Sequence, residues 1–336
     1  MQETRSVLTD KRSLAILIAA FAAVYIIWGS TYLAIKYAIE TLPTFLMAGF
    51  RFTVAGAILY AWARTSSGYE KPKLAHWKTS LIVGTLLLGI GNGGVVLAEH
   101  YISSSLAALL ISTTPFFIVL LGWVFMGSGR PNYKVALGLV VGFVGVTLLI
   151  FGRESDAGTG SNGQSFGIIA TLAATLAWAA GSLYATRGLA VRSSVQAAGM
   201  QMLAGGAVLL ATGTVTGEWA SFDPSSVSTT SALALGYLIV FGAIVAFTAY
   251  SWLLKNASPA AVSTYAYVNP AIAVLLGWAI AGETLTGLML AGAAVVVVSV
   301  ALITANKKAK AEKKKEAEVH SSLTPTADRK PISASA

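Results

Sequence analysis

Ten apolar stretches run along this chain, and each is long enough to cross a lipid bilayer as a helix. A helix rises about 1.5 Å per residue, so about 20 residues cover a hydrocarbon core of about 30 Å. We therefore predict an all-α integral membrane protein with ten transmembrane helices. The predicted spans are residues 14–35, 43–63, 80–98, 103–125, 135–151, 166–186, 195–214, 231–254, 260–281 and 285–305.

The last five stretches repeat the first five at nearly constant offsets. An offset of 155 residues matches the Leu-Leu-Gly-Trp segments at 120–123 and 275–278, and it also matches Pro115 with Pro270. Because each half holds five spans, the second half enters the membrane with inverted orientation, as in many transporters with a binding site between their halves. The pairs matched at an offset of 150 are Trp28 with Trp178, Arg51 with Gln201, and Gly56 with Gly206.

The predicted organisation follows from this duplication. Its parts are a cytoplasmic N-terminus (1–13), a first five-helix repeat (14–152), an extracytoplasmic linker (153–165), a second, inverted repeat (166–305) and a basic cytoplasmic tail (306–336). The tail is expected to fluctuate between helix and disorder at the surface, or to attach electrostatically to anionic lipid headgroups.

Composition and charge agree with a membrane protein. The chain is 55% hydrophobic and 11% charged, against about 25% charged residues in typical soluble domains. With no cysteine, disulfides and thiolate chemistry are excluded. Of the 23 Lys and Arg residues, 20 fall in segments on the side of the N-terminus and one, Arg153, falls in a loop on the other side. This asymmetry predicts cytoplasmic termini, and it accounts for the net charge of +9 without nucleic acid as a partner.

Polar, aromatic and helix-breaking residues inside the spans are the candidate site residues. Pro115 and Pro270 stand at matching depth, where each frees a backbone carbonyl; they mark either gating kinks beside a site or simple packing kinks. The Trp-Gly-Ser-Thr-Tyr segment at 28–32 and its counterpart at 178–184 either line a central cavity or pack helices closely. The candidate cavity residues are Trp28, Ser30, Tyr32, Arg51, Asn92, Thr114, Trp178, Ser182, Tyr184, Gln201, Tyr265 and Asn269.

Charged groups within or beside the spans are the most informative residues, because burying a charge in a bilayer is unfavourable. Arg51 lies inside the second span, where it either binds a substrate carboxylate or holds the two repeats together. Glu99 and His100 follow the third span. They are candidates for proton coupling, and the alternative is an ordinary pair at the water interface.

These residues resemble a known family. The chain is similar to the drug/metabolite transporter superfamily, to its EamA-type ten-helix permeases, and among those to the bacterial YedA-like branch. The resemblance covers residues 14–305. The segments that carry it are Trp-Gly-Ser-Thr-Tyr at 28–32, Leu-Pro-Thr-Phe-Leu-Met-Ala-Gly-Phe-Arg-Phe at 42–52, Gly-Asn-Gly at 91–93, Glu-His at 99–100, Ala-Ala-Leu-Leu at 107–110, Tyr-Val-Asn-Pro at 267–270 and Gly-Glu-Thr-Leu at 282–285.

The resemblance implies two EamA repeats, a plasma-membrane location, and export of small metabolites or drugs through a central cavity by alternating access. One departure is evident. The family often ends the fourth span with Gly-Glu, whereas Gly127 is followed here by Ser128. An acidic group at this position of the first repeat is therefore not expected to take part in gating here.

Other classes of function fit the sequence less well. An intramembrane enzyme would need paired catalytic groups or metal ligands, and the three histidines (His76, His100 and His320) fall in separate segments. An ATP-driven pump would need a phosphate-binding loop, and a selective channel would need a filter or charged rings.

We predict a secondary transporter, not an enzyme, that exports small metabolites or drugs, with amino acids and their derivatives foremost. The alternative is a metabolite importer, facilitator or low-selectivity channel. No cofactor or metal is expected; the partners are a small-molecule substrate and membrane lipids, and a homodimer is left open.

Overall fold

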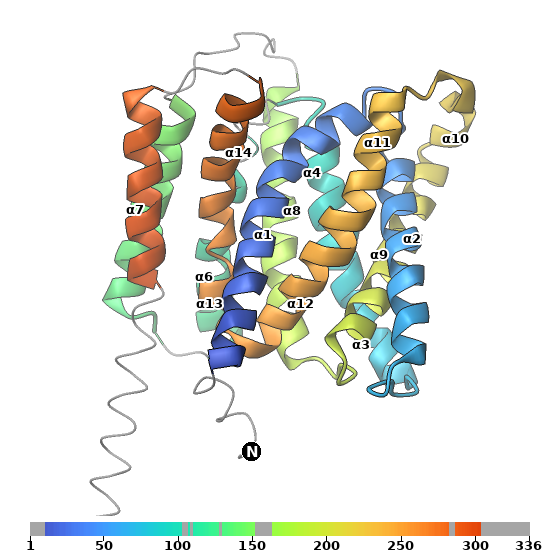
Figure 1. Ribbon diagram of the computed structural model, residues 1–336, viewed down its shortest axis with the longest axis horizontal. Coiled ribbons are helices and arrows are strands. Elements are labelled where there is room, and N and C mark those ends of the chain that lie inside the picture. The colour runs from blue at the N-terminus through green and yellow to red at the C-terminus, as the bar shows by residue number, and fades with distance from the viewer. Residues whose placement is uncertain are drawn as a thin grey trace, which may run out of the picture.

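The computed structural model describes residues 11–102, 107, 110–127, 130–151, 163–281 and 286–303, and all regular secondary structure in these residues is helical (Figure 1). The basic tail, most of the linker, and Gly282 and Glu283 lie outside the described residues. In the first repeat the helices are α1 (Lys11–Ala38), α2 (Thr44–Thr65), α3 (Leu74–Gly84), η2 (Thr85–Asn92), α4 (Gly93–Ala98), α6 (Thr114–Met126) and α7 (Tyr133–Phe151).

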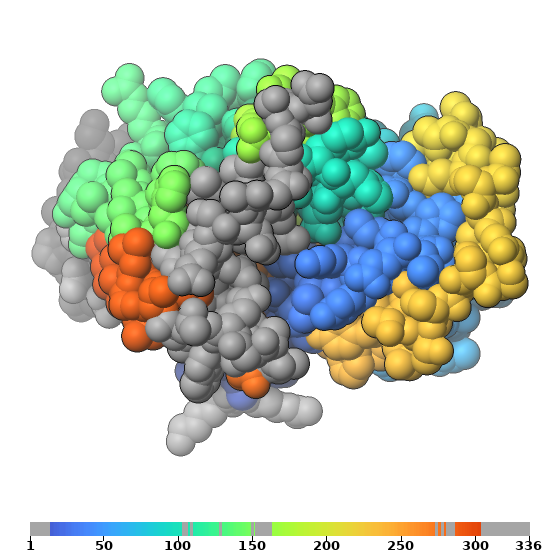
Figure 2. All heavy atoms as spheres, turned by 90° about the horizontal axis from the view of Figure 1, so that it is seen from above, coloured from blue at the N-terminus to red at the C-terminus, as the bar shows by residue number. Residues whose placement is uncertain are grey.

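The second repeat has a similar order of elements. Its helices are α8 (Gln164–Arg187), α9 (Ser194–Val215), α10 (Glu218–Ser221), η3 (Pro224–Ser226), α11 (Thr229–Tyr237), η4 (Leu238–Val245), α12 (Ala246–Asn256), α13 (Pro259–Val262), α14 (Tyr265–Ala281) and a last helix, Gly287–Ile303. Seen from above, α10 and its neighbours lie at one end of the molecule and α7 lies at the other (Figure 2).

Six helices are long and apolar enough to cross a membrane, which confirms an all-helical membrane architecture in the described chain. They are Leu14–Ala38, Thr44–Thr65, Leu74–Ala98, Gln164–Arg187, Ser194–Val215 and Thr229–Asn256. Shorter apolar helices stand at the positions of the other predicted spans, so the count of ten stays a prediction. The third span begins at Leu74 rather than at residue 80, because the helix continues through polar residues outside the apolar run.

The third and eighth spans share a feature that the sequence did not predict. Each contains eight residues of π-helix, η2 in the first repeat and η4 in the second, between two α-helical segments. A π-helix changes the direction of side chains along a helix and is frequently found at functional sites. The two segments occupy equivalent places in the two repeats, and both contribute residues to the pocket described below.

A second matched feature is a break in the fourth and ninth spans. A turn at Ser112–Thr113 precedes α6, and a turn at Ser263–Thr264 separates α13 from α14. The Thr113 hydroxyl donates to the Leu110 carbonyl at 2.6 Å, and the Thr264 hydroxyl donates to the Ala261 carbonyl at 2.6 Å. The backbone N–H groups of Thr113 and Thr264 donate to the same two carbonyls, at 3.1 and 3.3 Å. The hydroxyls therefore reinforce the turn at each break.

The two repeats meet most extensively where α2 crosses α9. A β-carbon at Gly56 would lie 2.8 Å from the backbone nitrogen of Leu203, and one at Gly206 would lie 2.8 Å from that of Thr53. These are the same contact related by the offset of 150 residues, so the crossing has approximate two-fold symmetry. The backbones approach this closely because glycine has no side chain there.

The first span of each repeat packs largely against the other repeat. Helix α1 contacts α11, η4, α12 and α14, whereas α8 contacts α3, η2, α4 and α6 (Figure 1). The halves of the sequence are therefore interleaved in space. At the edge of the bundle, α7 pairs with the helix Gly287–Ile303, where the Ser299 hydroxyl donates to the Gly138 carbonyl at 2.7 Å.

Candidate substrate pocket

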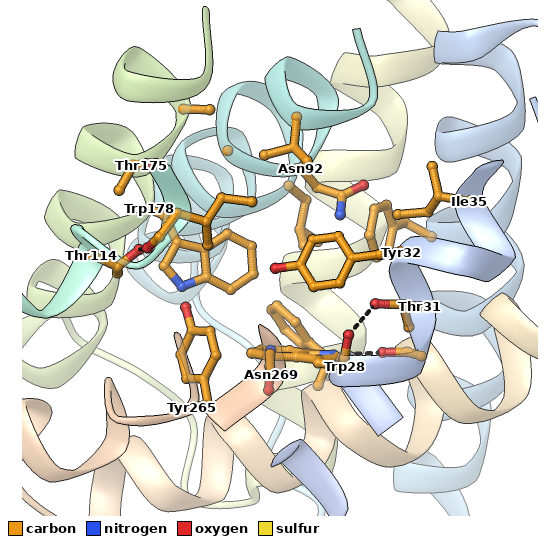
Figure 3. Close-up of a pocket in the computed structure, with 18 of the residues that line it drawn as sticks. Trp28, Thr31, Tyr32, Ile35, Asn92, Thr114, Thr175, Trp178, Tyr265 and Asn269 are labelled. Carbon is orange, nitrogen blue, oxygen red and sulfur yellow. Dashed lines mark hydrogen bonds between the residues drawn. The ribbon is translucent and has the colours of Figure 1, made fainter. Parts of the chain in front are cut away.

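A pocket lies among the helices of both repeats, with about 690 Å³ of empty space, part of it continuous with the solvent. Figure 3 shows Tyr32 reaching across it from α1 towards Trp178 on α8. The lining residues are Trp28, Thr31, Tyr32, Ile35, Arg51, Phe52, Leu88, Gly91, Asn92, Val95, Ile111, Thr114, Ala174, Thr175, Trp178, Gly242, Phe247, Tyr265 and Asn269.

An aromatic cluster closes one end of this pocket. The ring of Trp28 lies 5.5 Å from that of Trp178 and 5.0 Å from those of Tyr250 and Tyr265, centroid to centroid. Tyr250 is buried and does not line the pocket, so it lies behind the other three rings. Such tilted and edge-on contacts are favourable for aromatic pairs. We call Trp28, Trp178, Tyr250 and Tyr265 the aromatic floor.

Hydrogen bonds hold the floor in place. Trp28 Nε1 donates to the Gly242 carbonyl at 3.1 Å, which ties α1 to the π-helix of the second repeat. Trp178 Nε1 donates to the Tyr250 hydroxyl at 3.1 Å, and that hydroxyl lies 2.5 Å from the Ser182 hydroxyl. Both indole N–H groups and the Tyr250 hydroxyl therefore have hydrogen-bond partners despite burial. The Tyr265 hydroxyl points into the pocket (Figure 3).

Two amide side chains line the pocket, and they differ in whether they have hydrogen-bond partners. Asn269, when its amide nitrogen faces acceptors, donates to the backbone oxygens of Tyr25 and Tyr265 at 3.2 and 3.0 Å, so it joins α1 to α14. Asn92 lies at the end of η2, and its Oδ1 atom is buried with no hydrogen-bond partner in the described structure. Asn92 is thus free to accept a hydrogen bond from a bound molecule.

Arg51 lines the pocket from α2 and is 3% exposed. Its Nε and Nη1 atoms have no hydrogen-bond partner in the described part of the chain. The guanidinium carbon lies 4.3 Å from the centroid of the Phe52 ring, a weak cation–π contact. A buried cation with unused donors is unfavourable in a membrane interior unless an anion or water meets it.

The structure brings most of the predicted cavity residues together and places four elsewhere. The predicted residues that line the pocket are Trp28, Tyr32, Arg51, Asn92, Thr114, Trp178, Tyr265 and Asn269. Ser30 instead lies 2.5 Å from the Tyr237 hydroxyl, and Ser182 lies behind the floor, bonded to Tyr250. Tyr184 borders a separate hollow beside Arg187. Gln201 is buried on α9, which packs against α3, so it does not face the pocket as Arg51 does.

The two prolines stand at different distances from the start of their helices. Pro115 stands in the first turn of α6, directly after the break at Ser112–Thr113, where its missing N–H is tolerated. Pro270 lies inside α14, beyond the break at Ser263–Thr264. The breaks match at an offset of 151, whereas the prolines and the Leu-Leu-Gly-Trp segments that follow them match at 155. The distance from the break to the proline is therefore four residues longer in the second repeat.

Glu99 and His100 face different surroundings. His100 is exposed, and its Nε2 atom lies 2.7 Å from the Thr44 hydroxyl. Glu99 follows the end of α4, just beyond the span, and both of its carboxylate oxygens are buried without a hydrogen-bond partner in the described residues. Burial raises the pKa of Glu99 to about 8, although nearby Lys36 opposes this. The carboxylate is also within electrostatic reach of Tyr32 on the pocket wall.

Sequence reasoning missed several lining residues. Thr31 lies one helical turn after Trp28, and Thr175 lies one turn before Trp178, so helical spacing alone could have found both. Gly242, which lines the pocket, and Tyr250, which lies behind it, gave no such signal. Their roles depend on how η4 and α12 pack against α1 and α8.

Comparisons with known proteins agree with this architecture. Residues 14–151 and 165–305 each match the EamA-like transporter family. The chain is 37% identical over 298 residues to the "Uncharacterized inner membrane transporter YedA" of Escherichia coli (strain K12), covering 88% of this chain and 93% of that protein. It is 26% identical to the "Uncharacterized transporter YvbV" of Bacillus subtilis (strain 168), covering 87% and 92%.

A solved crystal structure shares the fold, with a TM-score of 0.68 and 21% sequence identity over 87% of this chain and 96% of that one. Each repeat thus matches one family of membrane transporters, which are not enzymes. The chain belongs to the EamA-like transporter family, within the drug/metabolite transporter superfamily.

Proposed function

We propose that this protein is a secondary transporter of the plasma membrane that exports small metabolites, amino acids and their derivatives foremost, by alternating access. The observation that carries the proposal is the pocket itself, because residues of both repeats line it and one end is closed by the aromatic floor. Export, rather than import, rests on the family resemblance.

The interleaving of the repeats suggests which parts move. Since α1 packs on the second repeat and α8 on the first, the moving bodies in our proposal are α8 with α3, η2, α4 and α6, against α1 with α11, η4, α12 and α14. The glycine crossing of α2 and α9 lies between them and serves as the pivot. Movement about it would separate the rings of the floor.

The excess of Lys and Arg on the side of the N-terminus supports an orientation with cytoplasmic termini and ten spans. Helix α1 then runs outward from Lys11 to Ala38, and the floor residue Trp28 lies on the cytoplasmic side of Ile35. In this proposal the floor is the inner gate, and the protein faces outward while the floor is closed.

An efflux screen with a blocked pocket tests the proposal. Cells that overproduce the protein would be challenged with toxic amino acids, purine analogues and cationic dyes, and intracellular accumulation would be measured. Val95→Trp places a bulky ring at a lining position, so we expect it to abolish resistance and restore accumulation. Val140→Trp is the matched control, because this residue is exposed at the edge of the bundle on α7.

Resistance that survives Val95→Trp at equal expression would show that the pocket is not the route. If no compound in the panel were exported while labelled substrates entered faster, export would give way to import or facilitated entry.

We further propose that Glu99 couples transport to protons, whereas the exposed His100 does not. The folded-state pKa of Glu99 is raised to about 8, so the folded protein binds more protons than the unfolded chain does. Its contribution to stability is therefore most favourable below the usual carboxyl pKa and is lost as pH rises through about 8.

Glu99→Gln should remove this dependence. Transport by reconstituted protein should lose its change in rate around pH 8. The melting temperature of the variant should fall less than that of the wild type as pH rises from about 4.5 to about 8. His100→Gln is the neighbouring control. An unaltered pH profile of transport in Glu99→Gln would rule out this carboxyl as the coupling group.

A further inference from the structure

Arg51 is the single charged side chain among the described residues that line the pocket, and no described carboxylate forms an ion pair with it. Arg51 is almost wholly buried, and Nε and Nη1 of its guanidinium have no hydrogen-bond partner in the described chain. If Arg51 held the repeats together, its donors would be expected to meet carbonyls or a carboxylate across that contact. The contact with the Phe52 ring uses none of these N–H groups.

The free guanidinium lies against the π-helix of the opposite repeat. A β-carbon at Gly242 would lie 3.7 Å from Arg51 Nη2 and 3.2 Å from the Thr31 side chain. Because glycine stands there, the wall beside the guanidinium carries no side chain. The Gly242 carbonyl already accepts a hydrogen bond from Trp28. The site thus combines open space with unused, charged donors.

The other lining groups restrict the kind of ligand. Among the described residues that line the pocket there is no carboxylate, so an organic cation would meet Arg51 without compensation. A phosphate ester carries more charge than one guanidinium neutralises. A carboxylate matches the guanidinium in charge and in its two-pronged geometry. The unused Oδ1 atom of Asn92 supplies an acceptor for an N–H group of the same ligand.

We propose that the pocket selects monocarboxylates, α-amino acids foremost, by seating the carboxylate on Arg51, with the amino group at Asn92 and the apolar body against the rings of Trp28 and Trp178. This deepens the proposed function and rests on it, since it names the substrate class of the same pocket. It follows that permanently cationic dyes are not substrates.

The test compares acids with their amides on the purified full-length protein. The probe pairs are L-leucine and L-leucinamide, L-phenylalanine and L-phenylalaninamide, and hydrocinnamate and hydrocinnamamide. Binding is followed by tryptophan fluorescence, because Trp28 and Trp178 line the pocket. We expect at least one acid to bind at least about tenfold more tightly than its amide, as the loss of a charge-assisted hydrogen-bond pair predicts.

Variants assign the selectivity to Arg51. Arg51→Gln should bring the ratio of acid to amide affinity close to one, whereas Arg51→Lys should retain part of it, because the charge remains without the planar fork. Arg64→Gln is the matched control, since this exposed arginine lies in the last turn of the same helix. If Arg51→Gln does not fold, the ratios of acid to amide affinity in the wild type and in Arg51→Lys still test the proposal.

Absence of acid-selective binding in all three pairs, or full selectivity in folded Arg51→Gln, would overturn the proposal. Efflux assays on the same probes separate this from the proposed function. Selective binding of acids without efflux would contradict the proposed export and support the carboxylate site. Efflux without selectivity for acids would contradict the carboxylate site and support the proposed export.

Discussion

Replacing Gly56 by valine is expected to prevent the protein from reaching its folded state. A β-carbon at this position would lie 2.8 Å from the backbone nitrogen of Leu203 and 2.9 Å from the backbone oxygen of Gly199. Backbone atoms cannot move aside as a flexible side chain can, so α2 and α9 would have to separate. Overpacking typically destabilises a protein by about 1–3 kcal/mol and occasionally by more. The rigid backbone neighbours place this substitution at the upper end, in the most extensive contact between the repeats.

The matched control is Gly236→Val. Gly236 also lies within a helix, α11, but a β-carbon there would meet nothing within 4 Å. Both variants carry the same low helix propensity of a β-branched residue, so their difference isolates the contact. Yield of monodisperse protein and melting temperature in detergent are the measurements. Equal yields and melting temperatures would show that the glycine crossing does not hold the repeats together.

The sequence predicted the membrane-spanning parts well, for a clear physical reason. A helix in lipid must satisfy its own backbone and expose apolar side chains over a fixed length, so its apolar run is visible without knowledge of its neighbours. Trp28 and Trp178 were found as a matched pair because duplication preserved both, and Arg51 and Asn92 were found because polar groups inside spans are rare.

What the sequence did not predict depends on contacts between helices. Nothing in residues 85–92 or 238–245 distinguishes a π-helix from an α-helix, since both satisfy the backbone within the span. The equivalence of Arg51 with Gln201 was a correct alignment but a poor guide to the pocket. The two residues lie on helices that cross each other, and only Arg51 faces the space between η2 and η4.

The packing of α1 on the second repeat was likewise invisible in the sequence. The duplication suggests that each half of the sequence folds as one group of helices. In the structure, however, the first span of each half packs largely against the helices of the other half. Tyr250 belongs to the aromatic floor because its helix, α12, packs against both α1 and α8 and so brings its ring against Trp28 and Trp178. A site assembled by such exchange is recognised only once the helices are placed in space.

The second large effect concerns access to the pocket, and this chain is suited to measure it because it has no cysteine. Val95 lies on the pocket side of the aromatic floor, whereas Val24, one helical turn before Trp28, is fully buried behind it. Single cysteines at these two positions, in otherwise unchanged protein, report the two sides of the floor without background. Val140→Cys, at the edge of the bundle on α7, controls for thiols that face lipid.

The most direct test measures how fast a membrane-impermeant maleimide labels these cysteines. The labelling is done in vesicles of either orientation, with and without an exported amino acid. We predict that Val95→Cys reacts only from the outside and Val24→Cys only from the cytoplasmic side, and that the exported substrate shifts the two labelling rates in opposite directions. Reaction of both cysteines from one side would indicate a continuous pore. Lasting protection of Val24→Cys, whatever the substrate, would show that the floor does not open, and alternating access through this pocket would be contradicted.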